Sequence, residues 1–225
     1  MDKNDRIKAH DREAHLYDRQ ALEYEYYTYD ALFGMCYEFI TPGERLLDLG
    51  IGTGLASLPF ARTGLEIHGL DGSAEMLKVC ETKKFTKELK CFDLSKTPLP
   101  YSDDFFSHVI CSGVLHFFDD LKPIFKDVAR IMREKGIFAF TVAMPPADAG
   151  KIIKDYGNGC VEMNTPWDVS IFAHSYSYIS TILQEHGFDT LKRQRIILPG
   201  GPEGGEDMIF AIFVTRKRSD VTSLP

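Results

Sequence analysis

The sequence predicts an α/β fold in which helices cover both faces of a mostly parallel sheet. Two observations predict it: strand-like and helix-like segments alternate through the middle of the chain, and a glycine-rich turn follows the first strand-like segment. The chain has 225 residues, of which 44% are hydrophobic, so it can bury one substantial core. We therefore expect one domain with an appendage rather than two domains.

The first part of the expected sheet lies between residues 45 and 93. We predict strands at residues 45–49, 66–71 and 89–92, and helices at residues 55–62 and 74–80. Gly64 follows the first helix at the position where glycine commonly ends a helix, and Ser73 is a good N-cap for the second. An aspartate stands at the end of each strand, namely Asp48, Asp71 and Asp93.

The second part of the sheet follows the same alternation. Residues 105–115 are typical of a buried strand and the loop that leaves it, and apolar residues recur at helical spacing from 121 to 132, before Gly136 ends the helix. A strand at 137–142, a helix at 176–186 and strands at 188–198 and 208–215 complete the pattern. Residues 143–175 are irregular and rich in glycine and proline, which is typical of a functional or disordered loop.

Composition excludes several classes of function. No apolar run reaches the roughly 18 residues of a membrane span, and the charged start lacks the apolar core of a signal peptide, so we expect a cytoplasmic protein. The five cysteines form no C-x-x-C pair, which indicates neither a metal site nor a disulfide framework. A net charge of −7 argues against nucleic acid as a partner. The basic run at residues 216–218 is interpreted as a solvated chain end.

The glycine-rich turn is the strongest functional signal. Gly50, Gly52 and Gly54 alternate after an apolar strand, so the backbone can bend sharply and approach a ligand closely. The dinucleotide-binding fingerprint is G-x-G-x-x-G, but Leu55 stands where its third glycine would be. Asp48 would repel a pyrophosphate beside this turn and attract an ammonium or sulfonium group. The turn therefore indicates a cationic ligand.

Residues 48–54 resemble the first motif of the class I S-adenosylmethionine-dependent methyltransferases, (D/E)-x-G-x-G-x-G. Ile51 stands where Cys or Ala is common, and Ser107 stands where the family often has Asp. The resemblance covers about residues 40–217. It implies a Rossmann-like sheet of seven strands, the seventh antiparallel beside the fifth. It also implies an N-terminal helical lid at residues 1–40, a methyltransferase domain at 41–217 and a flexible tail at 218–225.

The resemblance also implies the cofactor S-adenosylmethionine, with S-adenosylhomocysteine as its product. Asp48 would face the methionyl ammonium, Asp71 both ribose hydroxyls and Asp93 the adenine amino group, while Leu94 presents its backbone N–H to the ring. The full set of residues expected to contact the cofactor is Tyr17, Asp48, Gly50, Gly52, Thr53, Gly54, Asp71, Gly72, Ser73, Met76, Asp93, Leu94 and Cys111.

Methyl transfer from a sulfonium is an in-line displacement, in which alignment and exclusion of water supply most of the acceleration. A base is needed only if the acceptor must lose a proton, and His116 is the candidate, with His174 as a second. A structural histidine at a helix entrance is the alternative for His116. No metal is expected to take part.

Aromatic residues suggest the kind of acceptor. Tyr26, Tyr29, Phe33 and Tyr37 are spaced as one helix face, which indicates either core packing or a lid. Together with the rings of Trp167, Phe172 and Tyr176, they would enclose a small, partly apolar or aromatic acceptor. We expect a monomer or homodimer. Two other functions remain open, a non-catalytic cofactor-binding subunit and a nicotinamide-dependent oxidoreductase.

Overall fold

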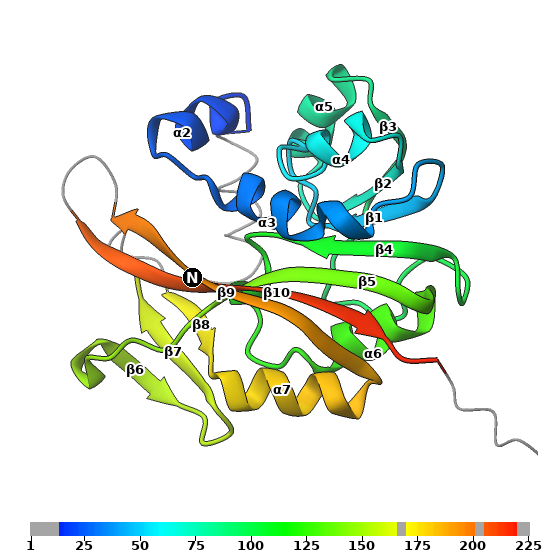
Figure 1. Ribbon diagram of the computed structural model, residues 1–225. Helices are drawn as coiled ribbons and strands as arrows, with labels where there is room; N and C mark the ends of the chain where they lie inside the picture. The colour runs from blue at the N-terminus through cyan, green and yellow to red at the C-terminus, as the bar shows by residue number, and fades with distance from the viewer. Residues whose placement is uncertain (1–13, 166–169, 201–204, 220–225) are drawn as a thin grey trace, which may run out of the picture.

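The computed structural model describes residues 14–165, 170–200 and 205–219. Its main element is a sheet of seven strands in the order β3-β2-β1-β4-β5-β10-β9, crossed by helices on both faces (Figure 1). The strands are β1 Arg45–Leu49, β2 Glu66–Asp71, β3 Thr86–Cys91, β4 Phe106–Cys111, β5 Met132–Ala143, β9 Phe188–Gly200 and β10 Gly205–Lys217.

The first five of these strands are parallel, and β10 runs antiparallel between β5 and β9. This arrangement confirms the predicted seven-stranded, mostly parallel sheet with an antiparallel strand beside the fifth. The order of strands changes direction at β1, which lies between β2 and β4. Ligands of such sheets bind beyond the carboxyl ends of the strands near this point, where the glycine turn follows β1.

Alternate side chains of the central strands enter two separate cores. Leu47 and Leu49 of β1 join a cluster that includes Phe125 of α6 and Ile179 of α7, whereas Leu46 joins a cluster on the opposite face. Figure 1 shows α6 and α7 on the side of the sheet opposite to α3. The helices are α2 Tyr17–Glu23, α3 Thr28–Cys36, α4 Leu58–Arg62, α5 Ala74–Thr82, α6 Lys122–Ile131 and α7 Tyr176–Glu185, with short 3₁₀ helices η1 Tyr37–Phe39, η2 Leu115–Phe117 and η3 Ala149–Lys151.

The predicted end of α6 at Gly136 was wrong. The helix ends at Ile131, and β5 begins at Met132. Lys135 adopts a positive φ of 62°, and a Cβ on Gly136 would lie 2.9 Å from the carbonyl oxygen of Ser107. Gly136 therefore allows β5 to bend closely against β4, where the pairing of the two strands shifts register. Met132 satisfies the apolar spacing of the helix and also begins the strand, so the sequence alone did not separate them.

The region from 143 to 175 was predicted to be irregular, but it contains a second sheet. Its three antiparallel strands are β6 Ile152–Asp155, β7 Cys160–Asn164 and β8 Ser170–His174. Gly157 and Gly159 adopt positive φ angles of 74° and 90° in the turn between β6 and β7. One face of the sheet packs on the ends of β5 and β10 through an apolar cluster that contains Val161, Met163 and Phe210. The strands have only four or five residues and are separated by segments rich in glycine and proline, so the sequence showed no clear alternation of apolar and polar residues.

The predicted aromatic helix face was also wrong. The chain turns between α2 and α3, with Glu25 at a φ of 54°, so Tyr26 precedes α3, while Tyr37 follows it and is 63% exposed. Phe33 does pack edge-on against Phe60 of α4, with ring centroids 5.0 Å apart. Only part of the expected stripe therefore serves the core.

The basic run at residues 216–218 is not a solvated chain end. Lys217 donates to the carboxylate of Asp104 at 3.1 Å, and Arg218 donates to the carbonyl oxygen of Gln184 at 3.0 Å. These contacts tie the end of β10 to the neighbouring elements. Residues 220–225 lie outside the described residues, and the division of the chain at 40 and 217 remains a prediction.

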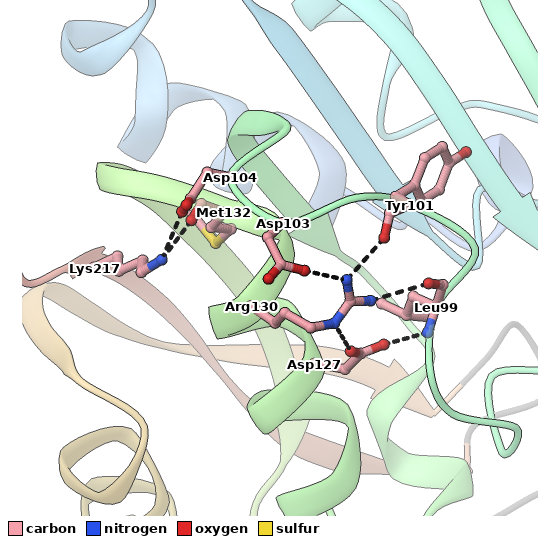
Figure 2. A network of polar contacts seen from close by, with 8 residues as sticks. All are labelled: Leu99, Tyr101, Asp103, Asp104, Asp127, Arg130, Met132 and Lys217. Atoms are coloured by element: carbon pink, nitrogen blue, oxygen red, sulfur yellow. Dashed lines mark hydrogen bonds and ion pairs between the residues drawn. The ribbon is translucent and has the colours of Figure 1, made fainter.

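An ion pair between buried Asp127 and partly exposed Arg130 holds the connection between β3 and β4 against α6 (Figure 2). Asp127 is 6% exposed and accepts a hydrogen bond from the backbone N–H of Leu99. Arg130 donates to Asp127 at 2.5 Å, to the carbonyl oxygen of Tyr101 at 2.8 Å and to that of Leu99 at 3.0 Å. One guanidinium thus satisfies two backbone carbonyls of a long connection that has little other regular structure.

Replacing Arg130 is expected to destabilise the fold. Arg130→Ala leaves Asp127 buried without its counter-charge, and should lower the free energy of unfolding by about 2–3 kcal/mol. Urea unfolding followed by circular dichroism measures the change. Arg19→Ala is the control, because Arg19 forms an exposed pair with Glu23 and should cost less than about 0.5 kcal/mol. Equal losses for the two variants would contradict this account of the connection.

Candidate functional site

The glycine turn after β1 adopts conformations that favour glycine. Gly50, Gly52 and Gly54 have φ angles of 78°, 54° and 89°. The N–H groups of Gly50 and Ile51 both donate to the carbonyl oxygen of Leu70, at 2.7 and 3.0 Å. A Cβ on Gly50 would lie 2.3 Å from Cγ2 of Val114. The turn is therefore held between the ends of β2 and β4, and its first glycine cannot be replaced without displacing the segment after β4.

The carboxylate of Asp71 connects two turns. One oxygen accepts from the N–H of Gly52 at 2.7 Å, and the other accepts from the N–H of Ser73 at 2.8 Å. It thus joins the turn after β1 to the turn after β2. Each carboxylate oxygen can accept more than one hydrogen bond, so a bond already made to the backbone does not by itself prevent contact with a ligand hydroxyl. The side chain is both a support of the site and a candidate ligand contact.

Asp48 is buried at the carboxyl end of β1, with 1% of its surface exposed. Its Oδ2 accepts from the hydroxyl of Ser57 at 2.6 Å, whereas its Oδ1 has no hydrogen-bond partner among the described residues. Burial raises the pKa of the Asp48 carboxyl to about 7, while the bond from Ser57 lowers it. Ser57 was not singled out from the sequence, although it lies at the start of the helix that follows the turn. A cation placed at Oδ1 would stabilise the ionised form.

The turns after β2 and β3 hold the other predicted residues. The hydroxyl of Ser73 accepts from the N–H of Met76 at 3.1 Å and caps α5, and Met76 is 4% exposed. Oδ1 of Asp93 accepts from both the N–H and the hydroxyl of Ser95, at 2.9 and 2.7 Å. Gly72 accepts a 3.7 Å contact from the thiol of Cys91, and Leu94 is buried. These residues form the rim of the site over β2 and β3.

The N-terminal helices contact the glycine turn through polar groups. The hydroxyl of Thr53 donates to Asp18 at 2.6 Å, and Lys83 lies 2.5 Å from the same carboxylate. The hydroxyls of Tyr17 and Tyr29 lie 2.9 Å apart. Burial raises the pKa of Tyr29 well above its ordinary value, and the charge of Asp48 adds to this effect. Tyr17 and Tyr29 are thus close enough to the strand-end acids for the charge of Asp71 to act on Tyr17 and that of Asp48 on Tyr29.

The two candidate bases differ in their surroundings. His116 lies in η2, half-buried, with its ring centroid 4.2 Å from that of Phe117 and 5.7 Å from that of Phe210. His174 is fully buried, and its Nε2 lies 3.0 Å from the carbonyl oxygen of Phe118, to which it donates. Burial lowers the pKa of His174 to about 4. His174 therefore holds the segment after β4 in place as a neutral ring, and His116 remains the candidate base.

The aromatic residues that were expected to enclose the acceptor do not form one cluster among the described residues. Phe172 packs against Tyr156 within the three-stranded sheet, and Tyr176 packs against Phe213, beneath the guanidinium of Arg193. These rings do not join Tyr17 and Tyr29 in one cluster. Trp167 lies outside the described residues. At the end of β4, burial raises the pKa of the Cys111 thiol well above its ordinary value, and the charge of Asp48 adds to this rise.

Comparisons with known proteins identify a family match for the part of the chain that carries these strand ends. Residues 47–140, which span β1 to β5, match the family model described as a methyltransferase domain. The match covers less than half of the chain. The matched residues contain Asp48, the three glycines, Asp71 and Asp93, so all three strand-end acids lie within the matched segment.

Two curated relatives and one solved structure extend this result. The chain is 29% identical over 108 residues to the uncharacterized methyltransferase YcgJ of Bacillus subtilis, which covers 47% of this chain and 43% of that protein. It is 28% identical over 184 residues to the demethylmenaquinone methyltransferase of Thermotoga maritima, which covers 74% of this chain and 77% of that protein. The chain thus spans less than half the length of the first relative.

The structure of Burkholderia thailandensis 1,6-didemethyltoxoflavin-N1-methyltransferase, with bound 1,6-didemethyltoxoflavin and S-adenosylhomocysteine, aligns with a TM-score of 0.69 at 14% identity. The alignment covers 96% of this chain and 87% of that one. The likeness confirms the predicted Rossmann-like methyltransferase fold. Among the described residues, no helix is long and apolar enough to cross a membrane.

Burial of Asp48 predicts a stability that falls as the pH rises. Its pKa is higher in the folded protein than in the unfolded chain, so between about pH 4 and 7 the folded state binds more protons. Asp48→Asn removes this penalty and should raise the free energy of unfolding by about 2–4 kcal/mol at pH 8, with little change at pH 4. Urea unfolding at both pH values tests this, and a gain that does not depend on pH would contradict it.

Proposed function

We propose that the chain transfers a methyl group from S-adenosylmethionine to a small, partly apolar or aromatic acceptor by direct in-line displacement. S-adenosylhomocysteine is the second product. The observation that supports this most strongly is the Asp48 carboxylate, buried beside a glycine turn with one oxygen unpartnered among the described residues. A site for a diphosphate would not place a carboxylate there, whereas a site for a cationic ligand requires one.

The residues present fit this cofactor. Asp48 would hold the methionyl ammonium, and the glycine turn that follows it, with Gly52 partly exposed and Thr53 beside it, would lie against the cofactor. Asp71 would accept from the ribose hydroxyls while it keeps its bonds to Gly52 and Ser73. The remaining proposed contacts are Tyr17, Gly50, Gly54, Gly72, Met76, Asp93, Leu94 and Cys111. When bound, the cofactor supplies an activated methyl group on a sulfonium.

The acceptor class is proposed from the surroundings of His116. The imidazole follows the carboxyl end of β4 and contacts two phenylalanine rings, those of Phe117 and of Phe210, and Phe210 belongs to the apolar cluster of the three-stranded sheet. Such surroundings suit an aromatic acceptor that must lose a proton from a hydroxyl or thiol group. Two similar proteins are named for aromatic or quinone-like substrates, demethylmenaquinone and 1,6-didemethyltoxoflavin, which supports this class.

The wider setting belongs to the same proposal. A net charge of −7 supports a small-molecule substrate rather than nucleic acid. We propose a cytoplasmic protein, present as a monomer or homodimer, that needs no metal for the reaction.

Removal of the Asp71 carboxylate should weaken cofactor binding. Asp71→Ala deletes the expected bonds to the ribose and the two backbone bonds that shape the turns, so the affinity for S-adenosylhomocysteine should fall by about 2 kcal/mol or more, roughly 30-fold. Isothermal titration calorimetry measures the loss, with Asp104→Ala as an exposed control outside the site. Unchanged affinity in Asp71→Ala would show that the ribose is held elsewhere. Binding of NAD in place of S-adenosylhomocysteine by the wild type would favour an oxidoreductase.

Removal of the His116 ring should affect turnover rather than cofactor affinity. His116→Ala should reduce the rate of methyl transfer by about 100-fold or more, because general base catalysis contributes on that order. The assay follows labelled methyl from S-adenosylmethionine to a panel of naphthoquinols, phenols and thiols. Phe117→Leu is the control for packing alone. A rate in His116→Ala equal to that of the wild type would leave His116 with a structural role.

A further inference from the structure

Ser112 carries a second buried polar atom without a partner. The residue is 8% exposed, and its hydroxyl has no hydrogen-bond partner among the described residues. Buried hydroxyls in folded proteins nearly always have one, so such an exception calls for an explanation. Sequence reasoning did not select Ser112, since one serine between apolar residues carries no motif. Its place in the sheet supplies the explanation.

Ser112 follows β4 directly, and its position relative to Asp48 is set by strand pairing. Asp48 of β1 pairs with Ile110 of β4, and Ser112 comes two residues after Ile110. Side chains two residues apart on a strand point to the same face of a sheet. Strands lie about 4.8 Å apart and rise about 3.3 Å per residue, so the Cα atoms of Asp48 and Ser112 are expected to be about 8 Å apart.

The shared face is the one covered by α3 and α4. Leu46 and Ile110 both enter the apolar cluster on that face, whereas Val109 and Cys111 enter the cluster on the side of α6 and α7. Asp48 is two residues after Leu46 and so points to the same face. The hydrogen bond that it accepts from Ser57, just before α4, agrees with this. Ser112 follows Ile110 in the same way. The two unpartnered oxygens therefore belong to one face and to neighbouring strand ends.

The backbone around Ser112 is fixed. The N–H of Gly113 donates to the hydroxyl of Thr141 at 2.9 Å, which ties the segment to β5. Val114 lies against Gly50, as shown by the 2.3 Å distance from its Cγ2 to a Cβ built on that glycine. Residues 112–114 are thus held between the glycine turn and β5. The Ser112 hydroxyl contributes no hydrogen bond to this support, which leaves it available to a ligand.

We propose that the Ser112 hydroxyl and the Asp48 carboxylate together bind one cationic group, the ammonium of the methionyl part of the cofactor. This inference rests on the proposed function and adds a residue to it. An ammonium group can donate three hydrogen bonds, so one ammonium placed between the two oxygens can donate to both of them. Asp48 supplies the charge, and Ser112 supplies a neutral acceptor that fixes where the ammonium lies. Ser112 is thereby a binding residue, not a base.

The test separates binding of the ammonium from binding of adenosine. Calorimetry is performed with S-adenosylhomocysteine and with 5′-methylthioadenosine, which keeps the adenosine and sulfur but lacks the ammonium. Ser112→Ala should bind S-adenosylhomocysteine about 10-fold or more weakly, since a hydrogen bond to a charged group is lost. It should bind 5′-methylthioadenosine with unchanged affinity. Ser112→Thr keeps a hydroxyl and should restore most of the loss.

A matched control lies on the same strand. Ser107 is also buried, but it lies near the start of β4, at the end away from Ser112. Its hydroxyl donates to the carbonyl oxygen of Arg45 in β1. Ser107→Ala should therefore change neither affinity. A double-mutant cycle with Asp48→Asn should show that the two losses are not additive, because both groups hold one ammonium.

Three results would overturn the inference. Equal weakening of both ligands in Ser112→Ala would show a structural role, and so would weakening by Ser107→Ala to the same extent. Unchanged affinity for both ligands in Ser112→Ala would show that the hydroxyl does not contact the cofactor. Failure of the wild type to bind S-adenosylhomocysteine would overturn the proposed function itself. If the wild type binds and only the Ser112 variants behave differently from expectation, the Ser112 assignment alone fails.

Discussion

The buried carboxylate of Asp48 is the constraint on which the site depends. Burying a carboxylate with one oxygen unpartnered within the described fold costs free energy, and the rise of its pKa to about 7 reflects that cost. A residue chosen for stability alone would be neutral here. Positions that break the rules of packing in this way are commonly functional, since a ligand can recover the lost interaction. On the proposed function, a cation bound at the end of β1 would recover this cost.

Other contacts hold the glycine turn that follows this carboxylate. Asp71 binds Gly52 and Ser73 and so keeps the turns after β1 and β2 together. Leu70 accepts from the turn after β1, and Val114 lies against it from the side of β4. Three strand ends therefore converge on one turn of the backbone. This convergence follows from the strand order, because β1 lies between β2 and β4 and all three run parallel.

Much of the candidate site could be predicted because its residues lie in short sequence motifs, each at the end of a strand. The glycines of the turn and the acids at strand ends are residue types with few other reasons to occur at that spacing, and the boundaries of β1 and β2 agree with the prediction. The three-stranded sheet could not be predicted, because its strands of four or five residues are stabilised by packing on β5 and β10 rather than by their own periodicity. Ser112 could not be selected from the sequence either, because the reason to propose it as a binding residue is that its buried hydroxyl has no hydrogen-bond partner among the described residues.

The N-terminal helices are joined to the site in a different way from the sheet. Asp18 reaches both Thr53 of the glycine turn and Lys83 at the end of α5. Thr53 is 1% exposed, so its hydroxyl has lost water and depends on that carboxylate. The side of the glycine turn that faces the helices is thereby satisfied within the chain, while Asp48 retains an unpartnered oxygen among the described residues. The contacts that hold the helices therefore do not use the Asp48 carboxylate, which on the proposed function is the group that would bind a cation.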